Sequence, residues 1–310
     1  MTHEGDVPIT ADHDSEGHTV SDEPRLAKAN FDEIYDQPDP RDYYRWLGAH
    51  DYSVPHYGTQ VFRQVLDALP VAQPTVVDLC CSYGVNAALL KHDVELHELY
   101  DRYGSDELTD LSPDDLVESD RAFFAGVRRD GAPEVIGLDV AGNAVDYAVE
   151  VGLLDHGLVA NLEIAEPTPE VAKAIGTADL LTVTGGVGYV TERTFGRLLD
   201  CAPEQKPWVA ALCLRTVPYD PIAESLAQQG LVTEQLDGVT FPQRLFVDEH
   251  ERAYALGELD ALGIAPDGRE AEGAYHVNVY LSRPEQDVAD RPLDDILADL
   301  PEPPDHIATS

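Results

Sequence analysis

The feature that most constrains the fold is a short strand signal that runs directly into a tight turn and a helix. Residues 75–79 (TVVDL) follow a proline and have the apolar, β-branched content of a buried strand. Residues 80–84 (CCSYG) are mostly small and predict a turn, and residues 85–90 (VNAALL) predict the start of a helix. A strand that passes straight into a helix is the building unit of a parallel sheet with helical crossovers.

This alternation continues along most of the chain. Further strand signals occur at residues 135–140, 158–164, 179–184 and 208–215. Helical signals follow them at residues 143–154, 169–175, 192–200 and 221–229. Two later strands, 243–247 and 276–281, are expected to form an antiparallel, hairpin-like pair. The sequence therefore predicts an α/β fold with a doubly wound, mostly parallel sheet of seven strands.

The charge balance sets the expected environment. Lys plus Arg number 20 and Asp plus Glu number 59, which gives a net charge of −39. Such a charge repels itself at low salt, whereas at molar salt the Debye length falls to about 3 Å. We therefore expect a halophilic, salt-adapted acidic protein in the cytoplasm. A nucleic-acid substrate is not expected because a duplex needs a basic footprint, and no apolar run reaches the roughly 20 residues of a membrane helix.

Both ends of the chain are polar and acidic. Residues 1–24 are expected to be a disordered acidic tail. Residues 284–310 are expected to be an acidic C-terminal tail, in which residues 293–300 could form a short helix. The four cysteines form no C-x-x-C pair and no histidine cluster has zinc spacing, so we expect reduced thiols and no metal site.

The turn after the first strand indicates which ligand the sheet could hold. In open α/β sheets, ligands bind outside the carboxyl ends of the strands. A dinucleotide site would need G-x-G-x-x-G there, but this turn keeps only Gly84. Asp78 would repel a phosphate and suits an ammonium group. S-adenosylmethionine carries an ammonium and a carboxylate but no phosphate.

Residues 76–84 (VVDLCCSYG) resemble the first motif of class I S-adenosylmethionine-dependent methyltransferases, in which an acidic residue precedes a glycine-rich turn. The resemblance implies a Rossmann-like methyltransferase fold with S-adenosylmethionine as cofactor, held in part by Asp78, Cys80, Ser82 and Gly84. Cys80 and Ser82 stand where that family usually has glycine.

Residues 135–139 (VIGLD) are similar to the second motif of that family, which ends a strand with a carboxylate for the ribose hydroxyls. Asp139 is the expected ribose ligand. It lies much further from Asp78 than the roughly 20 residues of a simple nucleotide-binding half, so residues 91–133 are expected to be a helical insertion. Glu98 has the usual spacing and is the alternative, but residues 94–103 are more typical of a helix than of a strand.

The resemblance also assigns the remaining cofactor contacts. Asn161 and Leu162 follow the third strand, in the region that approaches adenine in the family. Thr184 and Gly185 follow the fourth strand and should face the methionine end. The sequence after the fourth strand is not of the Asn-Pro-Pro-Tyr type, which argues against methylation of adenine or amide nitrogens by the route of those enzymes.

The segment 25–58 is rich in aromatic residues and is expected to be a lid over the substrate, at the start of a methyltransferase-like domain of residues 25–283. A base that removes a proton from the acceptor could be His56, Tyr57, Tyr189 or His250, and the first three are the expected catalytic residues. The sequence therefore predicts a methyltransferase for a small-molecule acceptor. Two alternatives stay open: a non-catalytic S-adenosylmethionine-binding protein and a nicotinamide-dependent oxidoreductase.

Overall fold

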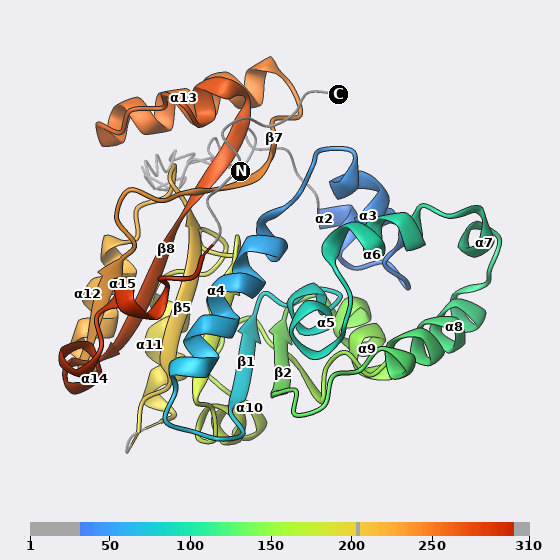
Figure 1. Cartoon of the computed structure of the whole chain (residues 1–310), viewed down its shortest axis with the longest axis horizontal. Helices are drawn as coiled ribbons and strands as arrows, with labels where there is room; N and C mark the ends of the chain where they lie inside the picture. The colour runs from blue at the N-terminus through green and yellow to red at the C-terminus, as the bar shows by residue number, and fades with distance from the viewer. Residues whose placement is uncertain (1–31, 203–204, 301–310) are drawn as a thin grey trace, which may run out of the picture.

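A central sheet of eight strands organises the chain in the computed structural model, which describes residues 32–202 and 205–300 (Figure 1). The strand order is β3-β2-β1-β4-β5-β8-β6, and β7 pairs with β8 outside this path. The strands are β1 (Thr75–Leu79), β2 (Glu134–Asp139), β3 (His156–Val159), β4 (Leu180–Thr184), β5 (Trp208–Leu214), β6 (Leu231–Gln235), β7 (Phe241–Leu245) and β8 (Ala274–Pro284).

The first five strands are parallel, and β8 runs antiparallel to β5, β6 and β7. The predicted doubly wound, mostly parallel sheet is therefore confirmed. It has one strand more than expected, because β6 was not predicted. The third strand is also shorter than predicted. It ends at Val159, and the backbone then turns, since the amides of Ile164 and Ala165 both donate to the carbonyl of Asn161.

Helices cover both faces of the sheet, as the alternation of strand side chains requires. Val76 and Val135 belong to one apolar core with α4 (Val54–Ala68), α5 (Val85–Lys91) and α9 (Gly142–Glu150). Their neighbours Val77 and Ile136 belong to a second core on the other face. That core is closed by α10 (Pro169–Ile175), α11 (Glu192–Asp200) and α12 (Asp220–Gln228).

The segment after β8 differs from the predicted acidic tail as far as the structure describes it. It forms α14 (Glu285–Asp290) and α15 (Leu293–Ile296), and Leu293, Ile296 and Leu297 are buried. These three apolar side chains are the physical reason that residues 285–300 pack on the domain. Residues 301–310 and the predicted tail 1–24 lie outside the described residues. One further helix, α13 (Glu249–Leu262), and the short η1 (Glu270–Glu272) connect β7 to β8.

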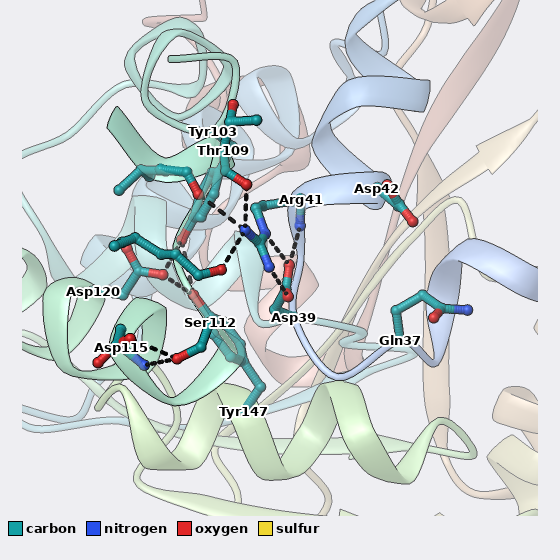
Figure 2. A network of polar contacts seen from close by, with 12 residues as sticks. Gln37, Asp39, Arg41, Asp42, Tyr103, Thr109, Ser112, Asp115, Asp120 and Tyr147 are labelled. Atoms are coloured by element: carbon teal, nitrogen blue, oxygen red, sulfur yellow. Dashed lines mark hydrogen bonds and ion pairs between the residues drawn. The ribbon is translucent and has the colours of Figure 1, made fainter. Parts of the chain in front are cut away.

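Most of the expected insertion, residues 91–133, is helical and extends to one side of the sheet in Figure 1. Its helices are α6 (Leu96–Tyr103), α7 (Asp106–Thr109) and α8 (Pro113–Gly126). Buried Asp120 on α8 accepts hydrogen bonds from the side chain of Arg102. It also accepts from the hydroxyls of Tyr103 and Tyr147 (Figure 2). Because Tyr147 lies on α9, this carboxylate joins the insertion to the main domain.

The N-terminal segment packs between the insertion and the sheet through α2 (Asp32–Tyr35) and α3 (Arg41–Gly48). One guanidinium nitrogen of Arg41 donates to three carbonyls of the insertion, those of Leu108, Thr109 and Leu111, at 2.9–3.1 Å (Figure 2). Tyr44 stacks on Tyr103 with ring centroids 4.3 Å apart. The insertion thus holds this segment in place over the carboxyl ends of the strands.

Candidate functional site

A cavity of about 300 Å³ lies at the carboxyl ends of β1, β2 and β4. The sheet contributes the residues that follow these strands: Cys80, Cys81, Ser82, Asp139, Val140, Ala141, Thr184, Gly185 and Gly186. The N-terminal segment closes the opposite side with Tyr35, Asp36, Tyr43, Leu47 and Tyr52. Ligands of open α/β sheets bind at this edge, and the volume is at the lower end of the range for small-molecule sites.

The turn after β1 has an unusual backbone. Cys80 and Ser82 have positive φ angles of 59° and 46°, and Gly84 has 74°. A non-glycine residue in this left-handed region costs about 1–2 kcal/mol. Cys80 and Ser82 stand where the methyltransferase motif usually has glycine, and at both positions glycine would adopt this backbone without strain. Such strain collects at functional sites, where the surrounding structure holds it.

Gly186, in the turn after β4, packs closely against the turn after β1, so only a residue without a side chain fits there. A Cβ atom on Gly186 would lie 2.7 Å from the sulfur of Cys80, so glycine is needed there. The hydroxyl of Ser82 is buried and has no hydrogen-bond partner among the described residues. Burial raises the pKa of the Cys80 thiol, aided by the nearby carboxylates Asp139 and Asp78, so this thiol stays protonated.

Asp78 is almost fully buried below the cavity and does not line it. It accepts hydrogen bonds from Thr182 at 2.7 Å and from the side-chain amide of Asn86 at 3.1 Å. Burial raises the pKa of Asp78 to about 6, against these two bonds. Asn86 does line the cavity, and its Oδ1 atom is buried without a partner. Asp78 therefore orients Asn86 so that its carbonyl oxygen is turned away from the carboxylate.

Asp139 lines the cavity at the end of β2. Its carboxylate accepts three backbone hydrogen bonds, from Ser82 at 2.8 Å, Val140 at 2.6 Å and Ala141 at 3.0 Å. This carboxylate therefore fixes the loops after β1 and β2 relative to each other. Glu98 instead lies on α6, where its side chain accepts from the backbone amide of Glu95 in a capping box, and it does not line the cavity.

The structure brings together Cys80, Ser82, Asp139, Thr184, Gly185 and Tyr189 of the predicted site residues. The other predicted residues lie apart from the cavity lining. His56 is exposed and pairs with Gln60 at 2.7 Å, and Tyr57 stacks on Phe241. Leu162 is buried in the core, Asn161 is exposed, and Gly84 caps α5.

Several lining residues were not predicted. Gln243 and Arg244 reach the cavity from β7, and Arg244 forms a bidentate ion pair with buried Glu251. Nothing in the sequence around them distinguishes them from an ordinary strand. Tyr35, Tyr43 and Tyr52 belong to the aromatic segment predicted as a lid. Its composition therefore indicated that the segment lies at the site, but not which of its residues line the cavity.

Within residues 32–202 and 205–300, no three His, Cys, Asp or Glu side chains are grouped so as to hold a metal ion. None of the helices described there is long and apolar enough to cross a membrane.

No protein-family model and no curated relative matches this chain. Solved structures do match its fold, and S-adenosylmethionine-dependent methyltransferases are among them. A TehB-like enzyme from Corynebacterium glutamicum shares 14% identity over 72% of this chain and 86% of its own, with a TM-score of 0.36. A methyltransferase from Aquifex aeolicus shares 15% identity over 82% of this chain and 99% of its own, with a TM-score of 0.37. The YcgJ protein of Bacillus subtilis shares 10% identity over 73% of this chain and 98% of its own, with a TM-score of 0.42. Similarity this distant assigns neither cofactor nor acceptor, so the function is argued from the site.

Proposed function

We propose that this protein is an S-adenosylmethionine-dependent methyltransferase that acts on a small-molecule acceptor. The observation that carries the proposal is the cavity at the carboxyl ends of β1, β2 and β4, with Asp139 on its wall and a left-handed turn at Cys80 and Ser82 beside it. A class I methyltransferase site has the same parts: a turn of small residues after the first strand and a carboxylate after the second.

The polar groups of the cavity fit this cofactor better than a dinucleotide. Ser82 Oγ and Asn86 Oδ1 are buried atoms with no partner, and both residues line the cavity. A buried polar atom without a hydrogen bond costs about 1–3 kcal/mol, so a ligand that supplies the missing partner is favoured. An amide oxygen suits an ammonium donor, and the carboxylate of Asp139 suits a ribose hydroxyl. A pyrophosphate would meet the carboxylates of Asp36 and Asp139 instead.

The residues then have separate tasks. Asp139 and Ser82 would hold the nucleoside half, and Thr184 and Gly185 would face the methionine half. Asn86, oriented by Asp78, would accept a hydrogen bond from the ammonium group. When bound, S-adenosylmethionine supplies an activated methyl group on a sulfonium, so the protein has chiefly to align the acceptor. Tyr189, about half exposed at 47%, is the candidate base that lies at the cavity.

Turnover distinguishes an enzyme from a non-catalytic binding protein. The protein would be incubated in molar KCl with S-adenosylmethionine and the small-molecule fraction of a cell extract, and S-adenosylhomocysteine would be measured. The proposal predicts product above the level of a heat-denatured control. Binding of the cofactor without any turnover would favour the non-catalytic alternative.

A further inference from the structure

The wall of the cavity opposite the turn after β1 (residues 80–84) is built from tyrosines. Tyr35, Tyr43 and Tyr52 line it from the N-terminal segment. Burial raises the pKa of all three hydroxyls, and for each pair their mutual proximity adds to the effect. These phenols therefore remain protonated at neutral pH and offer hydrogen-bond donors and aromatic faces, but they do not act as bases.

The other ionisable groups on the wall are already engaged. Asp36 accepts from the backbone amide of Asn143 at 2.8 Å, and Asp139 accepts its three backbone bonds. Arg244 donates to Glu251 at 2.9 and 2.5 Å, so its positive charge is balanced outside the cavity. Among the described lining residues the electrostatic balance is therefore negative, and no histidine is present to take a proton.

Gln243 lies in the middle of β7, beside the turn that follows β4. A Cβ atom on Gly185 would lie 2.7 Å from its amide nitrogen, and Tyr52 would be the next nearest neighbour at 3.7 Å. Gln243 is 5% exposed, and its Oε1 atom has no partner in the described chain. The free Oε1 atom can accept a hydrogen bond from a donor group on a small ring, next to the proposed methionine end of the cofactor site, and leave the ring nitrogen free to react.

We infer that the methyl acceptor is a small, neutral aromatic heterocycle that attacks through a ring nitrogen of the pyridine type. This inference rests on the proposed function. The nitrogen lone pair forms the new N–CH3 bond while the C–S bond breaks and its electron pair stays on sulfur. The positive charge passes from sulfur to the ring nitrogen, and no proton leaves. The reaction needs no base, oxidant or further reactant.

The surroundings favour this charge transfer over the alternatives. A cation on a ring nitrogen is stabilised by the faces of the tyrosine rings and by the net negative charge of the groups that line the cavity. A phenol or alcohol would have to lose a proton, and the candidate acceptors on the wall are poor ones: Tyr189 is itself a phenol, and Asp36 and Asp139 already accept backbone hydrogen bonds. An aromatic carboxylate would enter against Asp36 and Asp139.

The test uses three single-ring probes of similar size: pyridine, phenol and benzoate. Each is incubated at millimolar concentration with the full chain and S-adenosylmethionine in molar KCl, and S-adenosylhomocysteine and the methylated product are measured. Methylation of pyridine to N-methylpyridinium, at least tenfold faster than methylation of either other probe, supports the inference. Faster methylation of phenol or benzoate, or cofactor binding with no pyridine turnover, overturns it.

A matched pair of variants tests the role of Gln243. Gln243→Met keeps the side-chain length but removes the amide, and we expect kcat/KM for 3-(hydroxymethyl)pyridine, whose hydroxyl can donate to Oε1, to fall at least tenfold while affinity for S-adenosylhomocysteine stays within twofold. Gln228→Met, on the exposed side of α12, should change neither. An unchanged kcat/KM in Gln243→Met would refute its role as an acceptor ligand. Absence of S-adenosylhomocysteine binding in the parent protein would instead refute the proposed function itself.

Discussion

Glycine at position 82 should stabilise the free protein while it weakens the cofactor site. Ser82 has φ 46°, and relief of left-handed strain is worth about 1–2 kcal/mol. Glycine also loses about 0.5–1 kcal/mol more backbone entropy on folding than alanine does. Ser82→Gly and Ser82→Ala both remove the unpartnered hydroxyl, so that contribution cancels between them. The midpoints of these two ranges differ by roughly 0.75 kcal/mol, so Ser82→Gly should be more stable than Ser82→Ala by about that amount.

The assay is thermal unfolding of both variants without ligand in molar KCl. For a domain of this size, we expect the Tm of Ser82→Gly to exceed that of Ser82→Ala by about 1–4 °C. Addition of S-adenosylhomocysteine should raise the Tm of both variants less than that of the parent, because the hydroxyl is a proposed ligand contact. If Ser82→Ala is as stable as Ser82→Gly, the turn is not strained in the way the backbone angles indicate.

Three further predictions concern the carboxylates and the net charge. Asp139→Ala should weaken cofactor binding at least about tenfold by calorimetry, because hydrogen bonds to a charged group are worth about 1.5–3 kcal/mol each. Glu98→Ala should bind the cofactor like the parent, and the opposite ranking would reassign the ribose ligand. Asp78 has a pKa of about 6 against an ordinary value of 3.8, so its stabilising proton is fully present below pH 4 and is lost as the pH rises through 6. The free energy of unfolding of Asp78→Asn relative to the parent should therefore rise by about 2 kcal/mol between pH 4 and 7 in denaturant titrations. A constant difference would show that Asp78 does not titrate there. From the net charge of −39 we predict loss of secondary structure by circular dichroism below a few tenths molar salt, and equal stability from dilute buffer to molar KCl would reject salt adaptation.

The parallel part of the fold could be predicted because its strands are buried on both faces. Residues 75–79, 135–140, 179–184 and 208–215 are almost continuously apolar, and each is followed by a helical pattern. β6 escaped prediction because it carries Thr233, Glu234 and Gln235 and is only partly buried. Its place in the sheet comes from pairing with β8, which local sequence does not encode.

The cofactor side of the site could be predicted from the strand ends, since parallel strands deliver their carboxyl-terminal residues to one edge. The proposed role of Asn86 could not, because it depends on a side chain in the first turn of α5 that donates to buried Asp78. The side of the cavity that we propose for the acceptor depends on β7 and on the packing of the N-terminal segment against the insertion. Both are long-range contacts, which explains why His56 and Tyr57 were expected at the cavity while Gln243 and Tyr52 were not.

The central claim is that the cavity at the ends of β1, β2 and β4 holds S-adenosylmethionine. The most direct test is calorimetric titration of the full chain in molar KCl with S-adenosylmethionine and, separately, with NAD. The account predicts saturable binding of one S-adenosylmethionine per chain and no binding of NAD at the same concentrations. Binding of NAD without binding of S-adenosylmethionine would contradict it.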